Sequence, residues 1–240
     1  MTNSVLLDKN THKHTRIKTE RGTQYGEAVN YIPVVADELA QLALDYPVYF
    51  MKNNQTGQFE LYALTGFDEG QNLFLQNDIW HATYVPLHLQ RQPFKLGIGN
   101  KLTNKTEQTD LAVTINEQHP RVNNSEGTRL FNETGEPTTY LNNVSEQLIK
   151  LMHGGERTTA FINTLLKHDL IEAVQLNITK SNGKTQGYNG LYSIAADTLQ
   201  QLPTETLNVL HSMGYIQACH LILCSSGHIQ KLVKWLHDLK

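Results

Sequence analysis

Residues 171–194 read IEAVQLNITKSNGKTQGYNGLYSI, and this stretch decides the fold class. Two runs rich in β-branched and aromatic residues, Ile171–Thr179 and Gly187–Ile194, flank Ser181-Asn182-Gly183-Lys184. Strands favour such residues, and an Asn-Gly pair supplies the two positive-φ positions of a type I′ turn. The stretch therefore predicts an antiparallel β-hairpin.

Upstream of the hairpin, four more short runs have the composition of strands. Val48–Met51 and Gln58–Thr65 are separated by a polar loop that ends in glycine, which predicts an antiparallel pair. Asn72–Leu75 and Ile79–Tyr84 follow closely, so a meander of three or four strands is the economical assembly.

Apolar residues at helical spacing predict helices around these strands. One helix is predicted over Val35–Asp45, and one broken helix or two over 141–166, where Gly154-Gly155 interrupts the pattern. Further helices are predicted over 195–201, over 203–213 and at the C-terminus. The fold class is therefore α+β, with an antiparallel meander and a later hairpin packed with several helices.

The sequence predicts one domain preceded by a leader. Residues 1–30 are polar and lack sustained periodicity, which is typical of a flexible N-terminal segment. Residues 31–240 fit a single domain, because domains commonly span roughly 50 to 250 residues. Within it, Phe94–Glu136 is polar around one alternating run, Leu111–Ile115, and predicts a long irregular region.

Composition and charge argue against several classes of function. The net charge of −3 provides no basic field for a phosphate backbone, so no nucleic-acid partner is expected. The longest apolar runs, such as Ile216–Cys224, are too short to span a bilayer, so no membrane insertion is expected. The N-terminus lacks the apolar core of a signal peptide, and the two cysteines, Cys219 and Cys224, form no disulfide framework. A soluble, cytoplasmic protein without a cofactor is expected.

Three short patterns approach known motifs, and each fails at a particular residue. Gly183-Lys184-Thr185 resembles the end of a phosphate-binding loop, but Ile178 stands where that loop needs glycine. Gly97-Ile98-Gly99 lacks the third glycine of a dinucleotide fingerprint, because Leu102 occupies its position. Ser225 follows leucine and cysteine rather than glycine, so a nucleophile elbow is not predicted. No catalytic residue and no metal ligand is assigned.

The candidate ligand site lies around Pro86. Trp80, Tyr84, His88 and Arg91 gather aromatic and polar side chains within a short segment. Aromatic rings supply contact area in a pocket and arginine binds carboxylates, so these four residues predict a site for a small molecule or peptide. The alternative is a corner between a strand and a helix whose aromatic residues simply pack.

Cys219, His220 and His228 form a second group of reactive side chains. A cysteine beside a histidine can act as an activated thiolate, and both residue types bind metals. The spacing matches no usual zinc or thiol motif, so a buried apolar segment is the favoured interpretation. An enzyme with a dispersed Cys/His site is the alternative.

An ordered series of short motifs resembles one bacterial family. It comprises Tyr31-Ile32-Pro33, Asp45-Tyr46-Pro47, Gly70-Gln71-Asn72, Tyr84-Val85-Pro86, Arg91-Gln92-Pro93-Phe94, Gly135-Glu136-Pro137 and Gly190-Leu191-Tyr192. Over residues 31–240 the chain resembles the SapC family. The resemblance implies an association with surface-layer proteins, or an accessory part in the uptake or processing of a nutrient or peptide. It carries no catalytic residues over to this chain.

We therefore expect a non-catalytic, cytoplasmic binding or accessory protein. Its partner would be an unidentified small molecule, a peptide or another protein. Besides the dispersed Cys/His enzyme, the other alternative is a surface-layer or secretion component.

Overall fold

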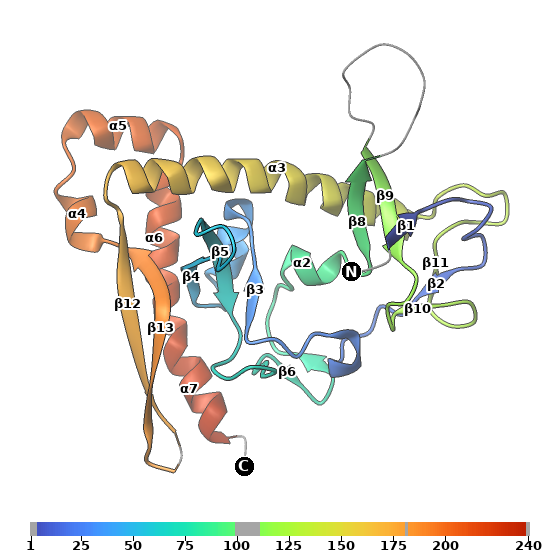
Figure 1. The fold of residues 1–240 in the computed structure, drawn as a ribbon, viewed down its shortest axis with the longest axis horizontal. Helices are drawn as coiled ribbons and strands as arrows, with labels where there is room; N and C mark the ends of the chain where they lie inside the picture. The colour runs from blue at the N-terminus through green and yellow to red at the C-terminus, as the bar shows by residue number, and fades with distance from the viewer. Residues whose placement is uncertain (1–3, 99–110, 181, 239–240) are drawn as a thin grey trace. The chain divides into compact units, whose positions relative to one another are not determined.

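The computed structural model describes residues 4–98, 111–180 and 182–238, and Figure 1 draws it as a ribbon. The chain divides into two compact units. Unit 1 consists of Met1–Glu27 and Leu87–His153, and unit 2 of Ala28–Pro86 and Gly154–Lys240. Each unit is thus assembled from two segments that are distant in the sequence. Gly99, Leu102 and Ser181, which entered the motif comparisons, lie outside the described residues.

A five-stranded antiparallel sheet forms the centre of unit 2. In order, it comprises β12 (Ile171–Thr179), β13 (Thr185–Ile194), β4 (Val48–Lys52), β5 (Phe59–Leu64) and β3 (Tyr31–Pro33). The predicted hairpin is β12–β13, but its loop is not the predicted two-residue type I′ turn. Thr179 pairs with Thr185 and the Lys180 N–H donates to the Lys184 carbonyl oxygen, so the loop between Lys180 and Lys184 is one residue longer and ends in Gly183 at a φ of 77°. The predicted pair over residues 48–65 is β4–β5. Together with the helices, these antiparallel strands confirm the α+β class.

The other two predicted strands form a sheet of their own. β6 (Leu75–Gln76) pairs with β7 (Ile79–Trp80), and within the described residues neither extends the β4–β5 meander. Asn77 and Asp78 join them with φ values of 52° and 61°. Two positive φ angles are the geometry of a type I′ turn, and Asn and Asp tolerate them better than other non-glycine residues.

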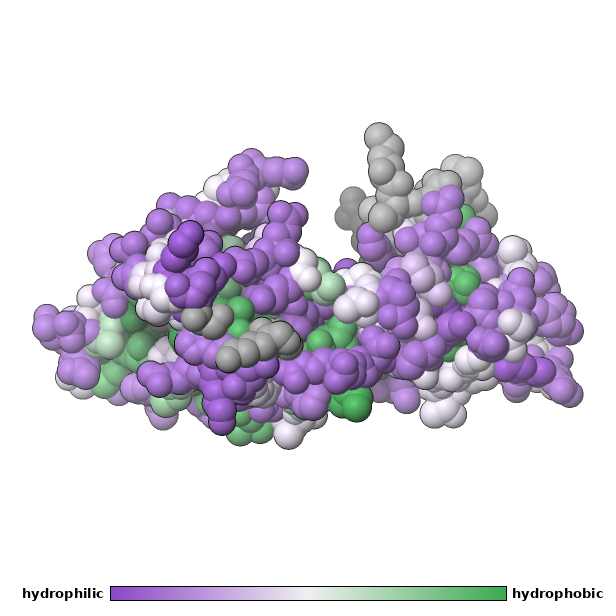
Figure 2. All heavy atoms as spheres, turned by 90° about the horizontal axis from the view of Figure 1, so that it is seen from below, coloured by the Kyte–Doolittle hydropathy of each residue, from purple (hydrophilic) through white to green (hydrophobic). Residues whose placement is uncertain are grey.

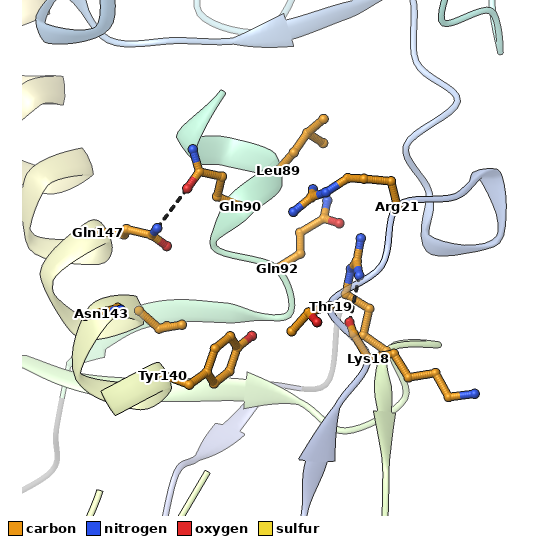
Figure 3. Close-up of a pocket in the computed structure, with 11 residues that line it drawn as sticks. Lys18, Thr19, Arg21, Leu89, Gln90, Gln92, Tyr140, Asn143 and Gln147 are labelled. Atoms are coloured by element: carbon orange, nitrogen blue, oxygen red, sulfur yellow. Dashed lines mark hydrogen bonds between the residues drawn. The ribbon is translucent and has the colours of Figure 1, made fainter. Parts of the chain in front are cut away.

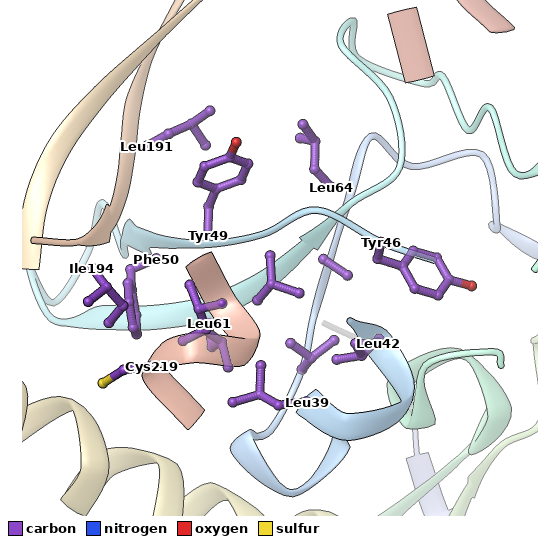
Figure 4. Packing of buried hydrophobic residues seen from close by; sticks show 14 of the residues in the cluster. Leu39, Leu42, Tyr46, Tyr49, Phe50, Leu61, Leu64, Leu191, Ile194 and Cys219 are labelled. Atoms are coloured by element: carbon purple, nitrogen blue, oxygen red, sulfur yellow. The ribbon is translucent and has the colours of Figure 1, made fainter. Parts of the chain in front are cut away.

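Helices cover one face of the five-stranded sheet. Helix α6 (Tyr215–Ser225) packs against β4 and β13, and α1 (Leu39–Leu42) and α5 (Thr204–Ser212) pack against α6. Side chains alternate between the two faces of a strand. Figure 4 accordingly shows Tyr49, Leu64 and Leu191 on one side of the strands, with Phe50, Leu61 and Cys219 on the other. The remaining helical segments of unit 2 are η2 (Ala36–Glu38), α4 (Ala196–Gln200), η3 (Ser226–His228) and α7 (Ile229–Asp238).

Helix α3 (Thr139–Lys167) is continuous through Gly154-Gly155, where the sequence predicted either one broken helix or two. Its predicted apolar faces are both buried: Leu141 and Leu148 lie in the core of unit 1, and Phe161 and Leu165 in the core of unit 2. Gly154 permits close packing, because a Cβ atom there would lie only 2.8 Å from Cγ2 of Val35. The glycine therefore serves packing rather than a helix break.

Two small sheets form unit 1. One has the order β1 (Ser4–Leu6), β9 (Leu111–Asn116), β8 (Phe94–Ile98), and in the other β2 (Arg16–Ile17) lies between β10 (Val122–Asn123) and β11 (Thr128–Arg129). The unit also contains η1 (Thr23–Tyr25), α2 (Leu87–Gln90) and the start of α3. Its core includes Ile17, Phe94, Ile115 and Leu130.

The strands of unit 1 come from the two regions in which the sequence shows the least periodicity. Residues 4–27, assigned to a flexible leader, supply β1 and β2, and the region 94–136, predicted to be irregular, supplies their partners. Strands of two or three residues are too short to show a repeating pattern. These short strands form by pairing with segments about a hundred positions away in the sequence, as Ser4 of β1 does with Asn116 of β9.

No described helix combines the length and apolarity needed to cross a bilayer. The face in Figure 2 is predominantly hydrophilic, with hydrophobic residues in patches among polar ones. Exposed apolar residues such as Leu44, Ile79 and Val209 come from different elements, and scattered residues of this kind are normal on protein surfaces.

Candidate functional site

The four residues predicted to form a ligand site fall in two different units. Trp80 and Tyr84 belong to unit 2, whereas His88 and Arg91 belong to unit 1, because the boundary lies between Pro86 and Leu87. A single pocket formed by all four therefore stays a prediction. Within its own unit, each pair has distinct surroundings.

Trp80 and Tyr84 belong to one chain of hydrogen bonds. Trp80 Nε1 donates to the Tyr46 hydroxyl over 2.7 Å, and that hydroxyl donates to the Tyr84 carbonyl oxygen. The Tyr84 hydroxyl in turn donates to Oε1 of the buried Glu38 over 2.8 Å. Burial, followed by the Glu38 carboxylate, raises the pKa of Tyr84 above its usual value. The polar atoms of this pair are thus engaged in holding β7 and its following loop on the core.

His88 and Arg91 line a shallow pocket of about 250 Å³ in unit 1, together with Lys95 and apolar residues of α3. Arg91 Nη1 donates to the carbonyl oxygen of Phe94 over 2.8 Å, and burial lowers the pKa of Arg91. The guanidinium therefore secures the turn between α2 and β8. The hydrogen bond to Phe94 uses only one of the five N–H donors of the Arg91 guanidinium.

A second cavity of unit 1, of about 190 Å³, is enclosed by more polar groups (Figure 3). Side chains reach it from the segment after β2, from α2 and the turn that follows, and from the start of α3. Those that carry its chemistry are Lys18, Arg21, Gln92, Arg121, Tyr140 and Gln147. Three of the described lining residues are cationic and none carries a carboxylate.

A buried carboxylate holds two of these cations in place. Glu27 is fully buried, and its Oε1 accepts hydrogen bonds from Arg21 Nη1 over 2.7 Å and from Arg121 Nη2 over 2.6 Å. The side chain of Arg121 is only 3% exposed, and its Nη1 donates to the carbonyl oxygens of Lys18 and Glu20. Its guanidinium also lies 4.2 Å from the centre of the Tyr25 ring. Arg121 is therefore held rigidly, and burial is the main cause of its lowered pKa.

Arg21 is the more available of the two arginines. Its side chain is 23% exposed, and among the described residues it donates a hydrogen bond only through Nη1, to Glu27. Nε and Nη2 are therefore open to a ligand on the cavity side. Lys18 adds a further positive charge, although it also pairs with the exposed Glu126 over 2.8 Å.

Whereas Arg21 offers hydrogen-bond donors, Gln92 offers an acceptor. Its Oε1 is buried, and no donor in the described part of the chain reaches it. The Nε2 amide of Gln147, which also lines the cavity, donates instead to Gln90 Oε1 over 2.8 Å. Tyr140 has a pKa raised to about 12, mainly by burial, so its phenol stays neutral near pH 7. The cavity thus combines anion-binding donors with one buried acceptor, and an unsatisfied buried acceptor marks a place for a missing donor.

The Cys/His group has a different environment. Cys219 is fully buried in the core of unit 2, and burial raises the pKa of its thiol to about 12, so it stays protonated at neutral pH. His220 is exposed on the next position of α6, and His228 Nε2 lies 2.9 Å from the Ala43 carbonyl oxygen. The described residues contain no cluster of three His, Cys, Asp or Glu side chains suited to a metal ion.

Sequence reasoning missed the residues of the 190 Å³ cavity. Lys18 stands in a basic N-terminal stretch, and Arg121 lies in a polar region without periodicity, so neither is distinguished from a solvated charge by local pattern. The one signal in the sequence was the motif Arg91-Gln92-Pro93-Phe94 of the family resemblance. It contains Gln92, which the structure places in the cavity wall.

Comparison with known proteins gives one positive result. No curated protein and no solved structure matches the chain. The model of the SapC family matches residues 7–232, and so covers most of both units. The chain belongs to the SapC family.

Proposed function

We propose that this chain is a non-catalytic binding or accessory protein whose cavity in unit 1 takes a small carboxylate that bears an adjacent hydroxyl or ammonium group. The observation that carries the proposal is that one cavity is lined both by Arg21, with its available N–H groups, and by Gln92, whose buried Oε1 has no donor among the described residues. A carboxylate satisfies the guanidinium, and a neighbouring O–H or N–H satisfies the amide oxygen.

The size and charge of the cavity narrow the class of ligand. Its volume of about 190 Å³ lies below the roughly 300 to 1,000 Å³ that is usual for drug-sized ligands, so only a few heavy atoms fit. Hydroxy acids and amino acids of the smallest size meet this limit. Recognition of such a molecule agrees with an accessory part in the uptake or processing of a nutrient or peptide. The same proposal places the protein in the cytoplasm, which suits its free cysteines, Cys219 and Cys224.

The test is calorimetric titration of the full chain with glycolate, glycine and acetate. Glycolate or glycine should bind about tenfold more tightly than acetate, because a donor to a buried acceptor contributes roughly 1 to 2 kcal/mol. Arg21→Gln should weaken binding at least tenfold, since it removes the charge-assisted contact to the carboxylate. Lys150→Gln is the matched control, because it removes one exposed positive charge of unit 1 at a residue that does not line the cavity.

Two results would contradict the proposal. One is the absence of binding by both glycolate and glycine at millimolar concentrations. The other is equal affinity in Arg21→Gln and in the unmodified chain. Binding of acetate as tight as that of glycolate would show that Gln92 makes no contact with the ligand.

A further inference from the structure

A groove in unit 2 lies apart from the residues of the proposed function. It opens on the sheet face opposite the helices, where Tyr62 and Met51 project from β5 and β4. Tyr31, on the edge strand β3, borders it. The groove has a volume of about 600 Å³, which is within the usual range for ligand sites, roughly 300 to 1,000 Å³.

Two tyrosines form the aromatic part of the groove. Tyr31 is 42% exposed, and its ring meets that of Tyr62 edge to face, with centroids 5.3 Å apart and planes at 88°. The Tyr62 hydroxyl donates to Glu60 Oε2, which fixes the orientation of the ring. An exposed aromatic ring has a partially negative face, which attracts partially positive C–H groups.

The rest of the groove is lined mainly by amides. Asn54, Gln55 and Asn189 supply side chains that can both donate and accept hydrogen bonds. The side chain of Asn53 is engaged within the protein, because its Oδ1 accepts from the backbone N–H groups of Gln55 and Thr56. Asn53 Nδ2 donates to Glu60 Oε1 over 2.9 Å, so this carboxylate already has two partners, Asn53 and Tyr62. Lys52 lies over the rings of Phe59 and Tyr192, at 5.1 Å and 5.4 Å from their centres. The two charges at the groove are therefore partly compensated within the protein, and the surface offered to a ligand is close to neutral.

A second, more apolar hollow continues the groove along the sheet. It has a volume of about 100 Å³ and shares Tyr31, Met51 and Asn189 with the larger one. A ligand longer than one compact ring would therefore find contacts on both sides of Tyr31. This continuity favours an extended molecule.

We propose that this groove binds a neutral oligosaccharide. Sugar rings present C–H groups on their faces, which suit Tyr31 and Tyr62, and hydroxyls at their edges, which act as donor and acceptor at once. The lining amides have the same dual capacity. A proline-rich peptide also docks on exposed aromatics, but proline offers acceptors only, so the amide oxygens would stay without donors.

The test is ligand-detected saturation-transfer NMR on the full chain with maltotriose, cellotriose and N-acetylated chitotriose, followed by titration of any trisaccharide that responds. Tyr31→Ala should weaken the binding of that trisaccharide about tenfold, whereas Tyr31→Phe, which keeps the ring, should stay within about threefold of the unmodified chain. Asn189→Ala, at an exposed position, should weaken binding severalfold without loss of fold.

Several outcomes would overturn the proposal. They are the absence of saturation transfer to all three trisaccharides, affinities of Tyr31→Ala and Asn189→Ala that equal that of the unmodified chain, and selective binding of a proline decapeptide that Tyr31→Ala abolishes. Circular dichroism of each variant separates loss of binding from loss of fold. Because the probes are uncharged, failure here leaves the carboxylate site of unit 1 untouched.

Discussion

The cavity of unit 1 and the groove of unit 2, both proposed as ligand sites, hold their polar groups by opposite physical means. In unit 1 the side chains of Glu27 and Arg121 are almost fully buried, and each supplies the counter-charge of the other. In unit 2 the groove is open, and Glu60 and Lys52 are compensated at its edge by hydrogen bonds and aromatic rings. Removing a partner from a buried pair is costly, whereas exposed pairs contribute little. The cavity in unit 1 is therefore coupled to folding, and the groove in unit 2 is not.

The largest effect that would test this contrast is expected from Glu27→Gln. The substitution leaves Arg121 buried without its counter-charge, and it should lower the free energy of unfolding by about 3 to 5 kcal/mol. Urea denaturation followed by circular dichroism measures the change. Glu60→Gln in unit 2, by comparison, should cost less than about 1 kcal/mol, because its surroundings are partly solvated.

Glu126→Gln provides the control within unit 1. It removes a carboxylate that pairs with Lys18 but is 72% exposed, and the expected loss is below about 1 kcal/mol. If Glu27→Gln lowered the free energy of unfolding no more than Glu126→Gln does, the buried pair of Glu27 and Arg121 would not stabilise unit 1. The contrast between the two units would then be wrong.

The same contrast explains what could be read from the sequence. The β12–β13 hairpin could be predicted because its pattern and its turn lie within one continuous segment, and the helical faces of α3 because their spacing is local. The cavity could not, because pairing of Ile17 with Val122 is what brings Arg21 and Arg121 to one carboxylate. The proposed cluster from Trp80 to Arg91 relied on proximity in the sequence, yet the unit boundary runs through it.

A smaller effect should separate the two sites by their response to salt. From about 0.01 M to about 1 M salt, the Debye length falls from about 30 Å to about 3 Å, which screens the contact between Arg21 and an anion. Glycolate affinity should therefore fall roughly fivefold, equivalent to about 1 kcal/mol. Trisaccharide affinity should change less than twofold, because the trisaccharide carries no charge. Parallel titrations at both salt concentrations measure the difference, and an equal response at the two sites would contradict the assignment of charge.

The smallest expected effect concerns pH and again belongs to unit 1. Burial, and then the neighbouring Arg121, lower the pKa of His119 from its usual 6.5. His119 Nδ1 also accepts a hydrogen bond from the Arg121 backbone N–H over 3.2 Å, which requires that nitrogen to be unprotonated. As the pH falls below 6.5, the unfolded chain takes up a proton that the folded chain binds more weakly, so the free energy of unfolding should decrease.

His119→Gln isolates this contribution, because glutamine offers an acceptor and does not titrate in this range. Urea denaturation at a series of pH values on either side of 6.5 should give a shallower decline for His119→Gln than for the unmodified chain. His211→Gln, an exposed position in unit 2 outside the groove, is the matched control and should keep the full slope. Identical slopes in all three proteins would contradict a lowered pKa of His119 in the folded chain, and with it the burial of His119 beside Arg121.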